Sequence, residues 1–108
     1  MQVGRELDAL IAEKIFKQTV VKNKKGGWSI GEADFYDEGG FLNLANPLPL
    51  YSEFIEDAWE IIKVIEGEIT ICCSKDGWSV VFKNGQSLEN TVEHAICLAA
   101  LRTKGVLI

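Results

Sequence analysis

The chain has 108 residues, of which 47% are hydrophobic and 25% charged, with a net charge of −5. This length corresponds to one domain, residues 1–108, and the composition is that of a globular chain rather than a disordered one. The negative charge argues against nucleic-acid binding, because acidic surfaces repel phosphate backbones. No stretch reaches the ~20 consecutive apolar residues of a membrane span, and the first ten residues lack the apolar core of a signal peptide. We therefore expect a cytoplasmic protein that binds neither nucleic acid nor membranes.

The first half of the chain predicts one helix followed by an irregular region. Apolar residues recur at helical spacing within Arg5–Lys17, with acidic residues in the first turn and lysines near the end, where the helix dipole favours them. Glycines and prolines punctuate the region from Thr19 to Leu50. Compact domains seldom contain a structureless loop of that length. We expect one or two short strands there, near Trp28–Ile30 and Phe41–Leu44.

The centre of the chain predicts a second helix and a hairpin. An apolar stripe runs along Glu53–Glu66, with Ser52 placed to cap its start and Gly67 to end it. Two runs of alternating residues, Ile69–Cys73 and Trp78–Lys83, then flank the pair Asp76-Gly77, which is a strong hairpin signal. Asn84-Gly85 is expected to end the second strand.

The last helix is expected over Thr91–Lys104, capped by Asn90 or Thr91 and ended by Gly105. Its segment Ala95–Leu101 is apolar on all sides, so it needs cover on two sides. A sheet can supply one cover, and a neighbouring helix or a second subunit the other. Exposed apolar patches mark interfaces, so we expect a homodimer. The alternative is that the segment from Thr19 to Leu50 covers the patch within one chain.

The fold class that follows is α/β (α+β): a small antiparallel sheet with helices on both faces. The order is helix, irregular β region, helix, hairpin, helix. This arrangement gives each apolar stripe a layer to pack on.

Three segments resemble a known family. They are Gly4–Leu10 with Ala12–Lys14, then Pro49–Ser52 leading into Ala58–Glu60, and finally Gly77-Trp78 with Glu93–Leu101. Together they are similar to the small bacteriophage and prophage proteins of the phage ABA-sandwich domain family. The resemblance implies helices on both faces of a sheet and a place in the host cell cytoplasm. It implies no activity and no catalytic residues.

The cysteines and the single histidine allow two kinds of site. His94 and Cys97 share a helix face and could bind zinc together with Cys72 or Cys73. However, the sequence contains no Cys-x-x-Cys pair, which zinc sites usually show. A cysteine nucleophile would have to use His94 as its base, and Cys97 lies in an apolar stretch that disfavours a thiolate. We interpret the cysteines as structural and expect no metal.

Two further patterns have simple structural explanations. The acidic side of the second helix could hold Mg²⁺ or act as general acid and base, but such a stripe is usually a solvated face; its members are Glu53, Glu56, Asp57 and Glu60. The glycine pairs Gly26-Gly27 and Gly39-Gly40 fit no phosphate-loop pattern, so we expect no cofactor.

The candidate ligand-binding residues are four aromatic side chains that could stack on a planar ligand, together with the histidine: Trp28, Tyr36, Tyr51, Trp78 and His94. We expect a non-enzymatic protein that acts by binding, as an oligomeric accessory or interaction protein. A protein that sequesters a small ligand, such as a nucleotide signal, is the alternative, and a small hydrolase is a third. A flat apolar patch would favour docking, convergent polar groups in a pocket would favour a ligand, and a perturbed histidine or carboxylate in a cleft would favour an enzyme.

Overall fold

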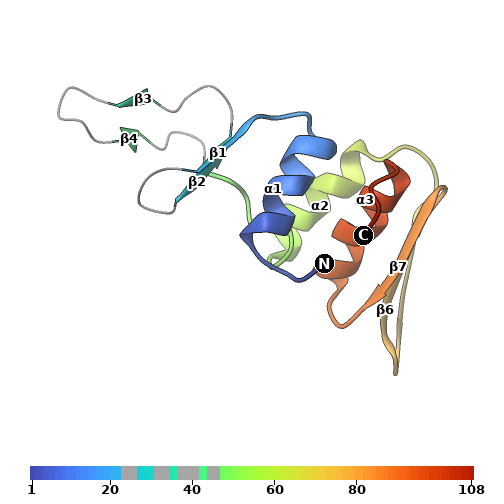
Figure 1. The fold of residues 1–108 in the computed structure, drawn as a ribbon. Helices are drawn as coiled ribbons and strands as arrows, with labels where there is room; N and C mark the ends of the chain where they lie inside the picture. The colour runs from blue at the N-terminus through green and yellow to red at the C-terminus, as the bar shows by residue number, and fades with distance from the viewer. Residues whose placement is uncertain (23–26, 31–34, 37–41, 44–46) are drawn as a thin grey trace.

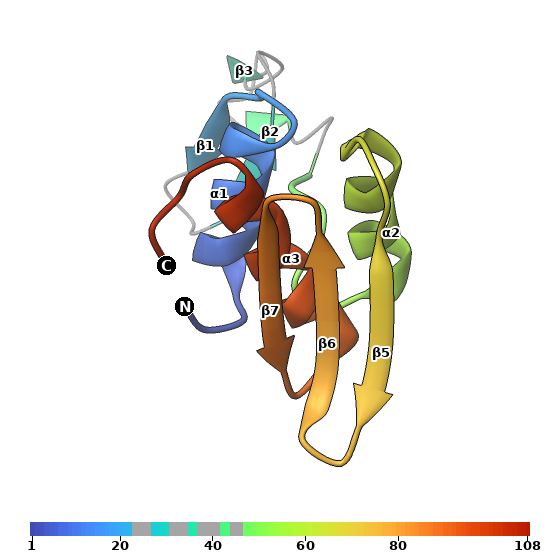
Figure 2. The same ribbon diagram turned by 90° about the vertical axis from the view of Figure 1, so that its right-hand side faces the viewer.

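The fold is an α+β arrangement, seen in a computed structural model that describes residues 1–22, 27–30, 35–36, 42–43 and 47–108. Within these residues three helices alternate with three small antiparallel sheets (Figure 1). The elements are α1 Arg5–Lys14, β1 Val20–Lys22, β2 Trp28–Ile30, β3 Phe35–Tyr36, β4 Leu42–Asn43, α2 Ile55–Val64, β5 Thr70–Ser74, β6 Gly77–Phe82, β7 Gly85–Glu89 and α3 Val92–Thr103. The expected α+β class and element order are confirmed, but the described helices all lie on one side of the β5–β7 sheet and not on both faces as expected (Figure 2). No helix among the described residues is long and apolar enough to cross a membrane.

Helix α3 is the central layer of the molecule. Strands β6 and β7 pack on one side of it, and α1 and α2 on the other (Figures 1 and 2). The apolar run Ala95–Leu101 is therefore buried within one chain, with Leu98 1% and Leu101 0% exposed. Thr91 caps the helix, because its Oγ1 accepts a hydrogen bond from the backbone N–H of His94 at 3.3 Å. The neighbouring helices supply the second cover, so the patch that motivated the dimer is not exposed on this helix.

The largest sheet has the order β5-β6-β7, with each neighbouring pair antiparallel. All three helices lie on one side of this sheet, so no described helix covers its other face (Figure 2). The predicted hairpin exists, but its two turn residues are Lys75 and Asp76, and Gly77 is the first residue of β6. Strand β6 ends at Phe82, close to the expected Asn84-Gly85, but the sheet continues. A second two-residue turn, Lys83-Asn84, leads into β7, a strand that was not predicted from the sequence.

Helices α1 and α2 are both shorter than expected. Helix α1 ends at Lys14, and Lys17 has a φ of 56°, a left-handed conformation that no helix can continue through. Helix α2 begins at Ile55 after Phe54, which makes no side-chain cap. The prediction that Ser52 caps this helix is wrong, because its hydroxyl is bonded to the backbone of Gly4. Gly67 has the positive φ, 100°, expected for a helix stop.

The glycine-rich region contains two short hairpins. Strand β2 covers the predicted Trp28–Ile30 and pairs with β1. Strand β4 lies inside the predicted Phe41–Leu44, whose end residues are outside the described part of the chain, and it pairs with β3. Ser29 forms an isolated bridge with Pro47, which ties this region to the segment entering α2.

Candidate functional site

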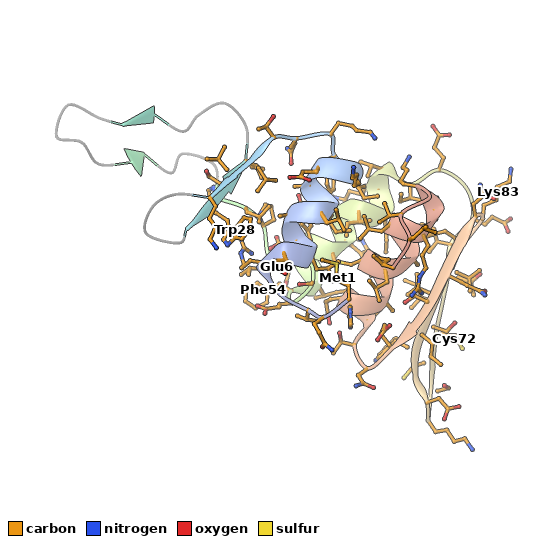
Figure 3. All side chains as sticks on the ribbon, in the orientation of Figure 1. Met1, Glu6, Trp28, Phe54, Cys72 and Lys83 are labelled. Atoms are coloured by element: carbon orange, nitrogen blue, oxygen red, sulfur yellow. The ribbon has the colours of Figure 1, made fainter. Side chains whose placement is uncertain are left out.

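The predicted ligand-binding residues that the structure describes lie on different elements of the fold. Trp28 lies on β2 at one end of the molecule, far from the β5–β7 sheet (Figure 3). Tyr51 is 4% exposed and stacks on Phe16, with ring centroids 5.2 Å apart, so it belongs to the core. Trp78 is half-buried on β6. The side chain of Tyr36, in β3, lies outside what the structure describes.

His94 fastens the start of the chain to α3. Its Nε2 lies 2.6 Å from the carbonyl oxygen of Met1, which can only accept, so Nε2 is the donor. Its Nδ1 lies 3.5 Å from Oε2 of Glu89 at the end of β7. Both ring nitrogens therefore face partners in the fold, and the ring is mostly covered. This geometry gives His94 a positioning role.

The three cysteines lie on two elements: Cys97 on α3 with His94, and Cys72 and Cys73 on β5. Cys97 is buried in α3, and this burial raises the pKa of its thiol far above the ordinary range, which keeps it protonated. Cys72 and Cys73 are exposed neighbours on β5, and adjacent strand residues point to opposite faces. Within the described residues, no three His, Cys, Asp or Glu side chains gather closely enough to hold a metal ion.

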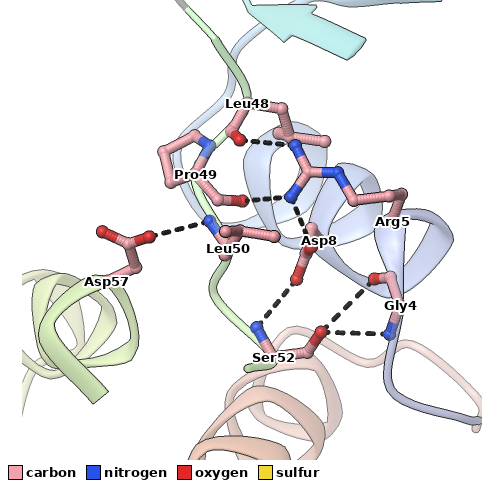
Figure 4. Close-up of polar contacts among 8 residues, drawn as sticks. All are labelled: Gly4, Arg5, Asp8, Leu48, Pro49, Leu50, Ser52 and Asp57. Carbon is pink, nitrogen blue, oxygen red and sulfur yellow. Dashed lines mark hydrogen bonds and ion pairs between the residues drawn. The ribbon is translucent and has the colours of Figure 1, made fainter. Parts of the chain in front are cut away.

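The densest group of polar contacts joins α1 to the segment before α2 (Figure 4). The carboxylate of Asp8 is fully buried and accepts from Nη1 of Arg5 at 2.8 Å and from the N–H of Ser52 at 2.7 Å. The Arg5 guanidinium also donates to the carbonyl oxygens of Leu48 and Pro49. These groups use their hydrogen bonds on one another, so the network holds the fold together and is not arranged to bind a substrate.

The acidic side of α2 is likewise dispersed. Asp57 Oδ2 accepts from the N–H of Leu50 at 2.8 Å, which anchors the preceding segment. Glu60 pairs with Lys63 at 2.9 Å on the surface. Glu53 and Glu56 are exposed. None of these contacts brings two carboxylates together, as acid–base catalysis or Mg²⁺ binding would require.

A hollow of about 460 Å³ lies beside the start of the chain and the beginning of α1. It is lined by residues 1–6 together with Lys22 and Trp28. The Lys22 Nζ sits 5.1 Å from the Trp28 ring centroid, a cation–π distance. Among the predicted ligand residues with described side chains, Trp28 lines this hollow.

The uncovered face of the β5–β7 sheet is the most distinctive exposed surface. The strand registers place Thr70, Val81 and Gln86 in one row and Cys72, Ser79 and Leu88 in the next. Val81 is 38% and Leu88 53% exposed. Ser74 extends the face along β5, and we call these seven residues the outer face. It contains no charged residue, although 25% of the chain is charged.

The outer face could not be predicted from the sequence, because its third strand, β7, was not predicted. One signal was available, because Asn84-Gly85 is a hairpin-type pair.

Comparison with known proteins identifies the fold. Residues 9–101 match the sequence model of the phage ABA sandwich domain. The chain belongs to this family. A phage protein from Bacillus cereus, whose crystal structure is known at 2.0 Å, is similar to this ABA sandwich protein with a TM-score of 0.66 and 25% identity. The match covers 95% of this chain and 92% of that one. No curated protein matches the sequence. The expected family resemblance is therefore confirmed.

Proposed function

We propose that this phage protein acts by binding, as an accessory interaction protein in the host cell cytoplasm. Its partner is a folded phage or host protein with a flat apolar patch, which docks on the outer face of the β5–β7 sheet. The observation that carries the proposal is that this exposed face has no charged residue. The cores of protein interfaces are depleted in charge in the same way.

The chemistry of the other exposed apolar residues supports this choice. On α2, Ile55 is 36% and Trp59 48% exposed, but Glu56 and Glu60 lie between and beside them. A partner docking there would have to desolvate carboxylates, which is costly unless they are paired. The outer face presents Val81 and Leu88 among neutral side chains, so docking removes apolar area from water without burying a charge.

The test uses affinity capture from phage-infected host cells, with one variant on the outer face and one matched control. Leu88→Lys places a charge on the outer face, and Trp59→Ser removes an exposed apolar side chain from α2. Both positions are exposed, so we expect both variants to keep the wild-type unfolding midpoint.

The captured protein is identified by mass spectrometry, purified, and its affinity for each variant measured. We expect Leu88→Lys to weaken binding at least ~10-fold, because lysine buried in an apolar interface loses its hydration, and Trp59→Ser to bind like the wild type. Equal affinities for all three chains would refute docking on the outer face.

A nucleotide-sequestering role is a second candidate, favoured by the Trp28 hollow. A cation beside an aromatic ring suits an anionic, planar ligand. Native mass spectrometry of the protein purified from its infected host would show a co-purifying nucleotide that Trp28→Ala releases. Recovery of a nucleotide that Trp28→Ala still retains would exclude this hollow as its site.

A further inference from the structure

We propose that two copies of this chain associate through the free edge of β5. In this dimer, β5 pairs antiparallel with β5 of the second copy, and the two sheets become one. This pairing does not depend on the docking function proposed above. If that function holds, pairing also joins the two outer faces into one continuous surface of twice the width.

The backbone of β5 offers an unused set of hydrogen-bonding groups. Ser74 pairs with Gly77 across a two-residue turn, and the pair that closes such a turn exchanges its N–H and C=O bonds. The alternation of an antiparallel ladder then directs the N–H and C=O of Ile71 and Cys73 away from β6. In the part of the chain that the structure describes, β5 has a strand neighbour on one side only. Four of its five residues are exposed.

The opposite edge of the same sheet is blocked. On β7 the outward carbonyl of Gln86 accepts from Nη1 of Arg102 at 2.8 Å. Arg102 is held in place by the carbonyl oxygen of Ile108, at 3.1 Å from Nε and 3.0 Å from Nη2. Natural edge strands are usually protected by such cover, or by charges, prolines or bulges. Strand β5 contains no charge and no proline.

The geometry of β5 specifies a second copy as its partner. Two identical strands can pair antiparallel when a two-fold axis perpendicular to the sheet relates them. The residue on this axis then lies opposite the same residue of the second copy. Pairing the full length of β5 places Cys72 opposite Cys72 of the second copy. Thr70 then faces Ser74, and Ile71 faces Cys73, whose outward backbone groups bond to each other.

The distribution of charge also favours self-association through the edge of β5 over self-association through the exposed apolar residues of α2. Each copy carries a net charge of −5, so a self-interface must avoid acidic groups. A two-fold contact through α2 would bring Glu56 and Glu60 of both copies together. Antiparallel pairing of β5 places no charged residue of the strand itself in the contact, because Thr70–Ser74 contains none.

The first test is oxidative cross-linking with oxidised glutathione. The two Cys72 residues would form a non-hydrogen-bonded pair, where Cα atoms are about 4.5 Å apart, within the range that a disulfide spans. Two thiols would be oxidised to one disulfide while glutathione disulfide is reduced. Cys73 faces Ile71, so it lacks a thiol partner. We expect a covalent dimer from the wild type and from Cys73→Ser, and none from Cys72→Ser.

The second test is sedimentation equilibrium under reducing conditions over micromolar to millimolar protein. We expect a monomer–dimer equilibrium for the wild type. Cys73→Pro removes the N–H that faces the second copy and no bond within the chain, so this variant should sediment at 12.0 kDa. Cys72→Lys places two ammonium groups opposite each other in the dimer, so this variant should also sediment as a monomer. It tests the pairing even if the proline variant does not fold.

Two outcomes would overturn the pairing: a wild-type mass of 12.0 kDa at every concentration, or a cross-link that requires Cys73 instead of Cys72. Failure of the docking function gives a different pattern. Leu88 lies two strands from the β5 edge, so Leu88→Lys keeps the dimer whether or not it loses the partner protein.

Discussion

At the scale of single residues, Asp8 is the buried charge that fixes the segment entering α2. Its carboxylate is 0% exposed and accepts from Arg5 and from the backbone of Ser52. Asp8→Ala would remove the carboxylate that pairs with the Arg5 guanidinium, and it would leave the buried N–H of Ser52 without an acceptor. We expect it to lower the free energy of unfolding by about 3 kcal/mol. Urea denaturation measures this change.

The matched control for Asp8 is the exposed pair Glu60–Lys63, whose side chains are 55% and 61% exposed. Glu60→Ala should change stability by less than about 0.5 kcal/mol, because surface ion pairs are screened by water. Equal losses for the two variants would show that the Asp8 network contributes no more than a surface pair.

Tyr51 makes the stability of the fold depend on pH in the alkaline range. Burial, followed by the neighbouring charges of Asp57 and Asp8, raises the pKa of its phenol from 10.0 to about 12. The unfolded chain therefore releases this proton about two pH units before the folded chain does. Ionisation of the unfolded state then lowers stability as the pH rises from about 10 to about 12, by roughly 2–3 kcal/mol.

Tyr51→Phe keeps the ring that stacks on Phe16 and removes the titrating hydroxyl. Its unfolding free energy, followed by urea titration at several pH values, should fall less than that of the wild type between pH 10 and 12. Parallel pH profiles for the two proteins would contradict the raised pKa.

At the scale of elements, Gly77 fixes the hairpin between β5 and β6. It has a φ of +126°, and a Cβ there would lie 2.4 Å from the carbonyl oxygen of Glu89 on β7. Gly77→Ala combines backbone strain with a backbone clash, so we expect a loss of at least about 2 kcal/mol. Gly105→Ala is the control, since φ is also positive there but the space is open. In thermal unfolding, the Tm of Gly77→Ala should lie well below the Tm of Gly105→Ala.

The elements that the sequence predicted best are those whose signals are local. The apolar run of α3 and its Thr91 cap, the β5–β6 hairpin and the β2 strand all follow from periodicity, capping and turn residues. The start of α2 was misplaced because Ser52, an ordinary capping residue, is bonded to Gly4, 48 positions away in the sequence. Contacts of that kind arise only from tertiary packing.

The candidate surfaces were harder to predict because they depend on pairing between distant elements. The outer face joins rows from three strands, and the β7 sequence Gly85–Glu89 contains no β-branched or aromatic residue to mark it as a strand. The aromatic residues chosen as ligand binders were identified by type alone. Packing distributed Trp28, Tyr51 and Trp78 over the surface, the core and the sheet.

At the scale of the whole molecule, α3 connects layers that barely touch otherwise. The β5–β7 sheet packs on one side of it and α1 and α2 on the other. Its seven consecutive buried residues, Ala95–Leu101, therefore belong to both halves of the core at once. A helix placed in this way should make the unfolding of the sheet and of the helical layer a single cooperative event.

Tryptophan fluorescence can test this cooperativity, because Trp59 lies on α2 and Trp78 on β6. The chain has three tryptophans, so Trp28 is replaced in both test chains and each keeps either Trp59 or Trp78 alone. Urea denaturation should then give the same midpoint for both probes. Leu98→Ala creates a cavity in the central layer and should lower the free energy of unfolding by about 3 kcal/mol. Since Leu98 serves both halves, both midpoints should fall together; a shift confined to one probe would mean that the sheet and the helices unfold independently.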